Sequence, residues 1–251
     1  MALRMAVEIF MALAALGLGI AAIVRARRAG ESVLDLLGLR WGPTAGRDLL
    51  AGMAITGLAM GGVFVAELGL GAIATAPAPA AAGSSLLVLA PVKLAFTLKE
   101  EIMMRSLLLS GLLMVLGGRA ALAVGLSALA FGCIHLTNPG ASLLSVLGNT
   151  LGGVIYGSAF VLARNLWLPI GLHFAWNFAQ GPLLGFPVSG MDAGGLQQVH
   201  DLGPTWLTGG SYGPEAGLVG IVARFVVMAL VLLWVGARTR GASPALQAAA
   251  S

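Results

Sequence analysis

The sequence predicts an all-α fold, a polytopic membrane helix bundle of about seven transmembrane helices, with eight as the alternative. Of its 251 residues, 58% are hydrophobic and only 10% are charged, and the mean hydropathy is +0.95. A soluble domain carries about 25% charged residues. The apolar runs have the length of membrane helices and lack the alternation of barrel strands. We therefore expect an integral membrane protein that is surrounded by a lipid bilayer.

The net charge of +4 does not indicate a nucleic-acid partner. The basic residues are scattered at the ends of apolar segments and form no cluster interleaved with aromatic residues. Membrane topology explains this placement, because cytoplasmic loops carry the excess of Lys and Arg. Lys93 and Lys99 are the only lysines among 14 basic residues, a bias that is typical of GC-rich bacterial genomes. We therefore expect the inner membrane of a bacterium.

Seven apolar segments form the expected spans. They cover residues 3–24, 49–73, 85–116, 120–137, 141–163, 167–186 and 216–236. The arginines that flank them favour an N-terminus outside and a C-terminus in the cytoplasm. We expect residues 1–241 to form a single polytopic domain and residues 242–251 to form a disordered tail.

The segments between the spans differ in character. Residues 32–39 form a short amphipathic stretch in the arginine-rich connection 25–48, suited to the membrane interface. The uncharged Ala/Pro/Gly segment 76–84 predicts an outer loop. The Gly-rich segment 187–214 predicts another, in which we expect His200 to be exposed to solvent.

Glycine patterns predict close helix packing at two places. Gly57 and Gly61 form a small-xxx-small pattern in the second span. In the fifth span, glycines recur on closely spaced faces at positions 148, 152, 153 and 157. We expect another helix to pack closely against each of these surfaces.

The segment 98–107 is unusual because it puts four charged residues into an apolar run. Ionisable groups at membrane depth persist mostly where they pair, line a cavity or perform chemistry. In a helix, Glu101 and Arg105 lie four residues apart in the favourable order and can neutralise each other. Glu100 points about 100° away and has no local partner, which makes it a candidate general base. The alternative is a purely structural ion pair, with Glu100 and Lys99 reaching for an interface.

Two of the three histidines lie inside apolar segments. His135 follows Phe131 by four residues and His173 precedes Asn177 by four, so that each pair shares a helix face. A single intramembrane histidine often only satisfies a hydrogen bond between helices. Together with an unpaired glutamate, however, two imidazoles and an amide are the groups needed to activate water and to stabilise an oxyanion.

If the two spans were straight helices that begin at opposite faces of the membrane, Glu100 and His135 would differ by about 16 Å in depth. The two residues can therefore meet one water molecule only if a helix is tilted, recessed or broken. We expect such a distortion near Pro91 or after Arg105, within the long run 85–116.

Three motifs on separate apolar segments resemble the CPBP family of intramembrane proteases, the CAAX prenyl endopeptidase and bacteriocin-processing (Abi) group. The motifs are Glu100-Glu101-x-x-x-Arg105, Phe131-x-x-x-His135 and His173-x-x-x-Asn177. The run Gly153-Val-Ile-Tyr156-Gly157, followed by Asn165-Leu-Trp167-Leu-Pro169, resembles the segment that precedes the last motif in that family. The resemblance covers about residues 85–180. One departure is Met104, where the family generally has an aromatic residue.

The resemblance implies an intramembrane endopeptidase, a hydrolase that cleaves a membrane-associated or lipidated peptide or protein. In this interpretation Glu100 is the general base and His135 holds the water. His173 and Asn177 bind the oxyanion. Glu101, Arg105 and Phe131 support the site. Met104 replaces the aromatic residue that the family generally has at this position. We expect this difference to change the shape of the wall of the site but not its chemistry.

Metal dependence and two other functions stay open at this level. Glu100, His135 and His173 could bind Zn²⁺ with an open coordination position, although a metal-free glutamate mechanism uses the same residues and is the one we favour. A non-catalytic membrane scaffold of the same family is one alternative function. A proton-coupled transporter that uses Glu100, His135 and His173 as a relay is another, but no inverted repeat is evident in the sequence.

Overall fold

The computed structural model describes residues 2–77 and 86–240. All seven predicted apolar segments are helical over most of their length. The helices that correspond to them are α1 (Ala2–Arg28), α3 (Ala45–Gly69), α4 (Leu86–Glu101) with α5 (Ser110–Val115), α6 (Ala120–Ile134), α7 (Leu143–Ala163), α8 (Trp167–Phe178) and α10 (Leu218–Arg240). Shorter helices are α2 (Val33–Leu36) and α9 (Thr205–Thr208). The expected tail, 242–251, lies outside the described residues.

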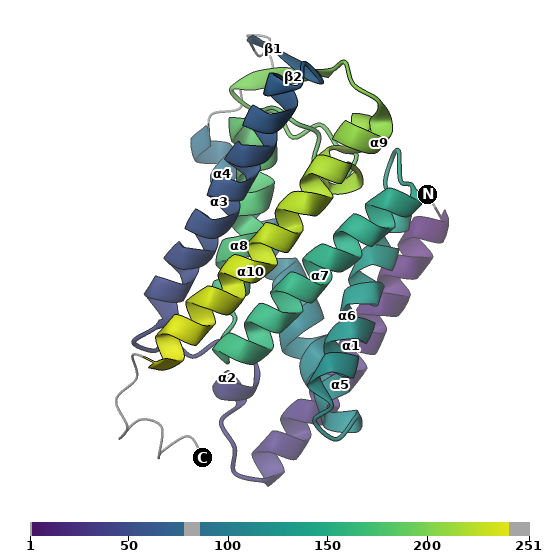
Figure 1. Cartoon of the computed structure of the whole chain (residues 1–251). Helices are drawn as coiled ribbons and strands as arrows, with labels where there is room; N and C mark the ends of the chain where they lie inside the picture. Colours follow the sequence, from purple (N-terminus) through teal and green to yellow (C-terminus); the bar gives the residue numbers. More distant parts are fainter. Residues whose placement is uncertain (1, 78–85, 241–251) are drawn as a thin grey trace.

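Four helices in the described part of the chain are long and apolar enough to cross a membrane: α3, α6 with its 3₁₀ extension to Thr137, α7, and α10 up to Arg238. The number of crossings therefore stays a prediction. The helix ends that carry arginine lie together at the lower end of the bundle in Figure 1, where α1, α7 and α10 terminate. This grouping agrees with the charge pattern from which the orientation was predicted.

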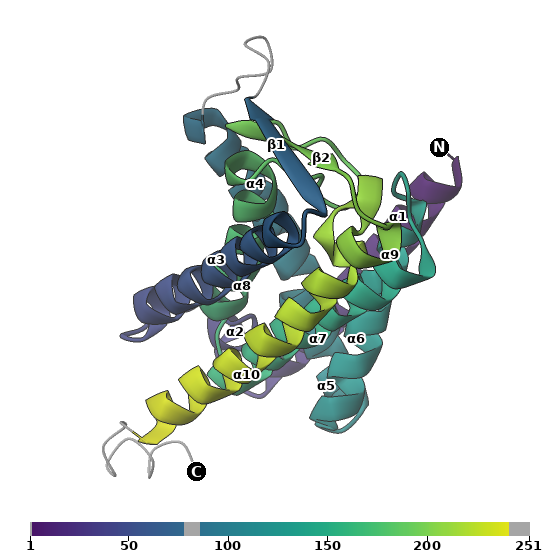
Figure 2. The ribbon, with the colours of Figure 1, turned by 45° about the horizontal axis from the view of Figure 1, so that its top comes forward.

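A small β-hairpin at the opposite end of the bundle was not predicted. β1 (Ile73–Pro77) pairs antiparallel with β2 (Gln197–Asp201), with Ile73 opposite Asp201. The second predicted span was too long at its end, because α3 stops at Gly69 and Gly71 adopts a positive φ of 66°, which only glycine adopts without strain. Figure 2 shows the two strands lying across the end of the helices. His200 is exposed on β2, as predicted.

The glycines of α7 pack closely against neighbours, as predicted. An added Cβ at Gly153 would lie 2.7 Å from the Cα of Ala128 in α6, and one at Gly157 would lie 3.2 Å from Val124. The packing predicted at Gly57 and Gly61 does not occur within the described part of this chain, where no atom lies within 4 Å of the Cβ position at either residue. The spacing of small residues identifies a surface of α3 and a surface of α7 on which another helix could pack. It does not indicate whether a neighbouring helix covers that surface.

The close approach of α3 instead occurs at Gly52. A Cβ there would lie 2.6 Å from the carbonyl oxygen of Leu168 in α8. On the α8 side, Gly171 meets the backbone of α3 at Leu49. The two glycines thus let the backbones of α3 and α8 touch, and α8 carries one of the candidate site residues.

The arginine-bearing end of the bundle is held by the buried carboxylate of Asp48 in α3. Its oxygens accept hydrogen bonds from Asn165 Nδ2 at 2.6 Å and from Trp234 Nε1 at 2.9 Å, and it forms an ion pair with Arg238. Asn165 Oδ1 also accepts hydrogen bonds from the first backbone amides of α8, groups that have no partner within the helix. Asp48 therefore joins α3 and α10 to the start of α8.

We predict that Asp48→Ala lowers the free energy of unfolding by about 3 kcal/mol or more, because it leaves buried donors without an acceptor. Asp35→Ala is the matched control. Asp35 pairs with Arg40 at 2.8 Å, but both side chains are more than half exposed, and such pairs contribute at most about 1 kcal/mol. Thermal unfolding in detergent compares the two variants. Equal unfolding midpoints would contradict the role of Asp48.

A second prediction concerns the glycine contacts. Gly153→Ala should destabilise the bundle by about 1–3 kcal/mol, because the added methyl group overlaps the backbone of α6. Gly61→Ala should be neutral or stabilising by up to about 1 kcal/mol, since it adds helix propensity in open space. The ranking of the two unfolding midpoints checks this, and a lower midpoint for Gly61→Ala would overturn it.

Candidate active site

Helix α4 turns one stripe of residues toward the protein and leaves the rest exposed. Val92, Leu94 and Phe96 are exposed, whereas Thr97 and Glu101 are completely buried. Glu100 lies beside this buried stripe with 22% of its side chain exposed. The two neighbouring carboxylates are thus placed in different environments, as their positions around the helix predict.

A π-helical segment, Ile102–Leu109, interrupts the helix directly after Glu101. Such segments are rare and occur frequently at functional sites. The expected distortion of the run 85–116 is therefore present, and it begins next to the acidic pair. Pro91, the other expected position, lies within α4.

Glu101 makes two charged contacts in the interior. Its Oε1 lies 3.2 Å from Arg105 Nη1, which confirms the predicted ion pair. The same oxygen lies 2.7 Å from His173 Nδ1 on α8. Because an ionised carboxylate only accepts hydrogen bonds, Nδ1 of His173 carries the proton in this contact. Glu101 therefore fixes the orientation of the imidazole as well as the charge of Arg105.

Aromatic rings surround these charges. The Arg105 guanidinium lies 4.6 Å from the ring centroid of Phe131 and 5.2 Å from that of Tyr156. Tyr156 also stacks on His173, with centroids 4.8 Å apart and planes inclined by 13°, while Phe131 meets the same imidazole edge-on at 5.8 Å. Contacts of this kind stabilise a desolvated cation. They also join α6 and α7 to α8 at one point.

His173 lies close to both carboxylates. Its Nε2, opposite the nitrogen bound to Glu101, is 3.8 Å from Glu100 Oε2. Glu100 makes no hydrogen bond to any described residue, and its carboxylate is therefore available to another molecule. The structure brings Glu100 and His173 together across two helices.

His135 lies just past the end of α6, at the start of a 3₁₀ turn. Its Nδ1 lies 2.7 Å from the carbonyl oxygen of Phe131. Since a carbonyl only accepts, Nδ1 donates, and Nε2 of the neutral ring is left as an acceptor. Glu100, Glu215 and His173 all lie within electrostatic range of this imidazole. The ring of His135 is also 4.8 Å from that of Phe131.

Asn177 lies one helical turn beyond His173 on α8 and is half-buried. Within the described part of the chain its side chain makes no hydrogen bond. It shares a helix face with His173, as predicted from the spacing. Cys133, two residues before His135, is a free and half-buried thiol.

The residues do not fit a zinc site. Within residues 2–77 and 86–240, no three His, Cys, Asp or Glu side chains lie together as metal ligands. The Nδ1 contacts of His173 and His135 leave Nε2 of both rings open, so the misfit rests on the spacing of the side chains and not on these contacts. We therefore describe no step through a metal ion.

Three residues near the site were missed at the sequence level. Tyr156 was noted only as part of a motif, yet it stacks on His173. Glu215, just before α10, is buried and accepts hydrogen bonds from Gln180 Nε2 at 2.6 Å and Ser189 Oγ at 3.1 Å. Lys93 lies two turns before Glu100 on the inner side of α4, within electrostatic range of Glu100 and Glu215. In the sequence, the only indication of a role for Glu215 is that it is a single acidic residue directly before an apolar segment.

Glu215 and its neighbours hold the outer segment 187–214 over this end of the bundle. Ser189 comes from that segment, and so does Tyr212. Burial raises the pKa of Tyr212 to about 12. Its hydroxyl therefore stays neutral, and it accepts a hydrogen bond from Asn149 Nδ2 at 2.8 Å. The outer segment is thus attached by polar contacts to Asn149 on α7 and to Gln180, which lies in the π-helical segment Ala179–Leu183 directly after α8.

Comparison with known families agrees with these observations. Residues 80–179 match the model of the type II CAAX prenyl endopeptidase, Rce1-like family. The match covers 100 of the 251 residues and includes all three motifs. It confirms the predicted resemblance to the CPBP family of intramembrane proteases. No curated protein and no solved structure gives a match.

We predict that the two adjacent glutamates differ in their contribution to stability. Glu101→Gln should lower the free energy of unfolding by about 3–5 kcal/mol, because Arg105 is then left buried without a counter-charge. Glu100→Gln should change it by no more than about 0.5 kcal/mol, since Glu100 is partly exposed and has no hydrogen-bond partner. Thermal unfolding of the two purified variants tests this, and equal midpoints would refute the division of roles.

Proposed function

We propose that the protein is an intramembrane endopeptidase that hydrolyses a peptide bond in a membrane-associated or lipidated substrate. The observation that carries the proposal is the pairing of Glu100, a carboxylate without a hydrogen-bond partner, with His173, an imidazole held in place by Glu101. The match of residues 80–179 to a family of CAAX prenyl endopeptidases supports the same class of reaction.

In the proposed reaction Glu100 and His135 act on the attacking water. Both present acceptors: the carboxylate of Glu100, and Nε2 of His135, whose Nδ1 proton is donated to the Phe131 carbonyl. Glu100 removes a proton as the water oxygen attacks the carbonyl carbon of the substrate. As the C–N bond of the tetrahedral intermediate breaks, Glu100 delivers this proton to the leaving nitrogen, so that the products are an amine and a carboxylic acid. General base catalysis of this kind contributes about 10²–10⁴-fold to a rate.

His173 and Asn177 are the proposed donors to the oxyanion. As a donor through Nε2, His173 must carry a second proton, because its Nδ1 proton is donated to Glu101. A protonated His173 also balances the local charge. The positive charges of His173 and Arg105 then face the negative carboxylates of Glu100 and Glu101. His173 Nε2 and Glu100 Oε2 lie 3.8 Å apart, which is too far for a direct hydrogen bond.

The substrate is proposed to reach the site from the membrane or its surface. Glu100 lies on a helix whose other faces are apolar and exposed, which suits a chain held at the bilayer. A lipidated or membrane-anchored peptide would present its peptide bond at this depth.

The experiment compares peptides released in membranes that contain the wild type or the Glu100→Gln variant at equal abundance, by mass spectrometry. Gln keeps the size of the side chain and removes the base. We expect the cleavage products to fall at least about 100-fold. Lys99→Gln is the matched control, because Lys99 is exposed and its ammonium lies 5.7 Å from the ring centroid of Phe96.

Products that are equally abundant in all three samples would overturn the catalytic role of Glu100. In that case a change in transport, or in the abundance of a membrane partner, would favour the relay or the scaffold.

A further inference from the structure

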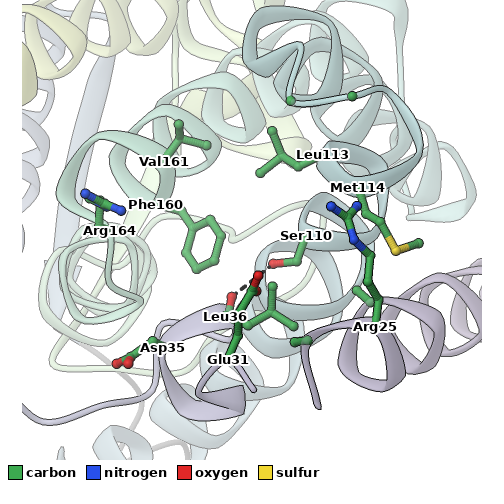
Figure 3. Close-up of a pocket in the computed structure, with 14 residues that line it drawn as sticks. Arg25, Glu31, Asp35, Leu36, Ser110, Leu113, Met114, Phe160, Val161 and Arg164 are labelled. Carbon is green, nitrogen blue, oxygen red and sulfur yellow. Dashed lines mark hydrogen bonds between the residues drawn. The ribbon is translucent and has the colours of Figure 1, made fainter. Parts of the chain in front are cut away.

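One cavity of the described structure is not lined by the candidate catalytic residues. It has a volume of about 610 Å³ and lies at the arginine-bearing end, between the ends of α1, α5 and α7 and the short helix α2. Figure 3 shows Arg164 and Arg25 on opposite sides of this cavity, with Glu31 between them. Neither the family match nor the proposed reaction gives this cavity a role.

The charged side chains of the cavity are available to a ligand. Arg25 and Arg164 make no side-chain hydrogen bond or ion pair with described residues, and the same is true of the Glu31 carboxylate. Asp35, the other acid in the wall, is already paired with Arg40 at 2.8 Å. The cavity thus offers two guanidinium groups and one carboxylate, which suit a ligand that carries an anionic and a cationic group.

The rest of the wall is apolar. Leu113 and Met114 come from α5, and Phe160 and Val161 come from α7. Figure 3 shows these side chains on the side of the cavity away from α2. Charged groups next to an apolar wall at the ends of membrane helices match a molecule with a polar head and an acyl chain.

The backbone at Arg164 supports a role for its side chain. This residue ends α7 in the left-handed conformation, with φ 57° and ψ 31°. Glycine is the usual residue at this position, because it adopts a positive φ without steric cost. In the described chain only Ser189 is another non-glycine residue with positive φ. The arginine thus occupies a position at which the backbone alone favours glycine.

We propose that this cavity binds a phosphodiester that carries a primary ammonium group, as in the head group of an ethanolamine phospholipid. Arg25 and Arg164 bind the phosphate, since guanidinium groups match phosphate oxygens in geometry and charge. Glu31 accepts hydrogen bonds from the ammonium group. The apolar wall of α5 and α7 contacts the first part of an acyl chain.

The test measures lipid binding to the purified full-length chain by native mass spectrometry. The probes are phosphatidylethanolamine, phosphatidylcholine and phosphatidylglycerol with identical acyl chains, and glycerophosphoethanolamine as the head group without chains. We expect phosphatidylethanolamine to bind at least about tenfold more tightly than the other two lipids, because only it offers both a phosphate and N–H donors to Glu31. Equal binding of the three lipids would overturn the proposal.

Two variants separate the roles of the charges. Arg164→Gly should weaken phosphatidylethanolamine binding at least about tenfold without lowering the unfolding midpoint, because glycine accepts the left-handed conformation. Glu31→Gln should remove the preference over phosphatidylcholine. Arg47→Ala is the control, since Arg47 is an exposed arginine at the same end that does not line the cavity. An equal loss in Arg47→Ala and Arg164→Gly would refute a defined site.

The head group without acyl chains distinguishes the source of the ligand. If glycerophosphoethanolamine competes only weakly, the ligand is a membrane lipid. If it competes as well as the lipid does, the same groups bind a soluble phosphoethanolamine ester. Failure of all ethanolamine probes to bind overturns the site and leaves the proposed peptidase reaction untouched.

Discussion

The contact between Glu101, Arg105 and His173 is the interaction on which the interior of this bundle depends. Charges buried in an apolar bundle persist only where each finds a partner. Here one carboxylate oxygen serves both a guanidinium group on the π-helical segment and an imidazole on α8. The rings of Phe131 and Tyr156 enclose the guanidinium from α6 and α7. Four separate stretches of the chain are thereby fixed around a single charge.

This arrangement explains why the adjacent glutamates Glu100 and Glu101 differ in their surroundings and contacts. Glu101 is completely buried and uses its charge to organise neighbours. Glu100, one residue earlier, is partly exposed and makes no hydrogen bond with the residues that the structure describes. The difference comes from the rotation of about 100° between successive helix residues. The buried carboxylate of Glu101 thus orients the imidazole of His173, whose other ring nitrogen faces the carboxylate of Glu100 at 3.8 Å.

The sequence predicts those features that follow from spacing along one helix. The pairing of Glu101 with Arg105, and the shared face of His173 and Asn177, need only the helical period. The contact between Glu101 and His173 joins residues 72 positions apart, and no local pattern specifies which helices meet. The family resemblance placed His173 in one site with Glu100 but paired Glu101 only with Arg105, so the contact between Glu101 and His173 was not predicted.

The remaining errors have a similar origin. Gly57 and Gly61 satisfy a packing pattern but face open space, because the neighbouring helix approaches α3 at Gly52. The β-hairpin joins two segments that are short, far apart in sequence and weakly patterned. Tyr156 and Glu215 were missed because their significance depends on what lies opposite them. Each case requires knowledge of the partner surface, which a single sequence does not contain.

The polarity of the segment around Glu101 has a consequence for biogenesis. A charged residue at the centre of a membrane helix costs about 2.5–3.5 kcal/mol on insertion, and this segment carries Lys99, Glu100, Glu101 and Arg105 close together. Most of what compensates these charges lies on helices that are synthesised later, at Phe131, Tyr156 and His173. The segment supplies the Glu101–Arg105 ion pair itself, but its charges gain the imidazole of His173 only once α8 has been synthesised.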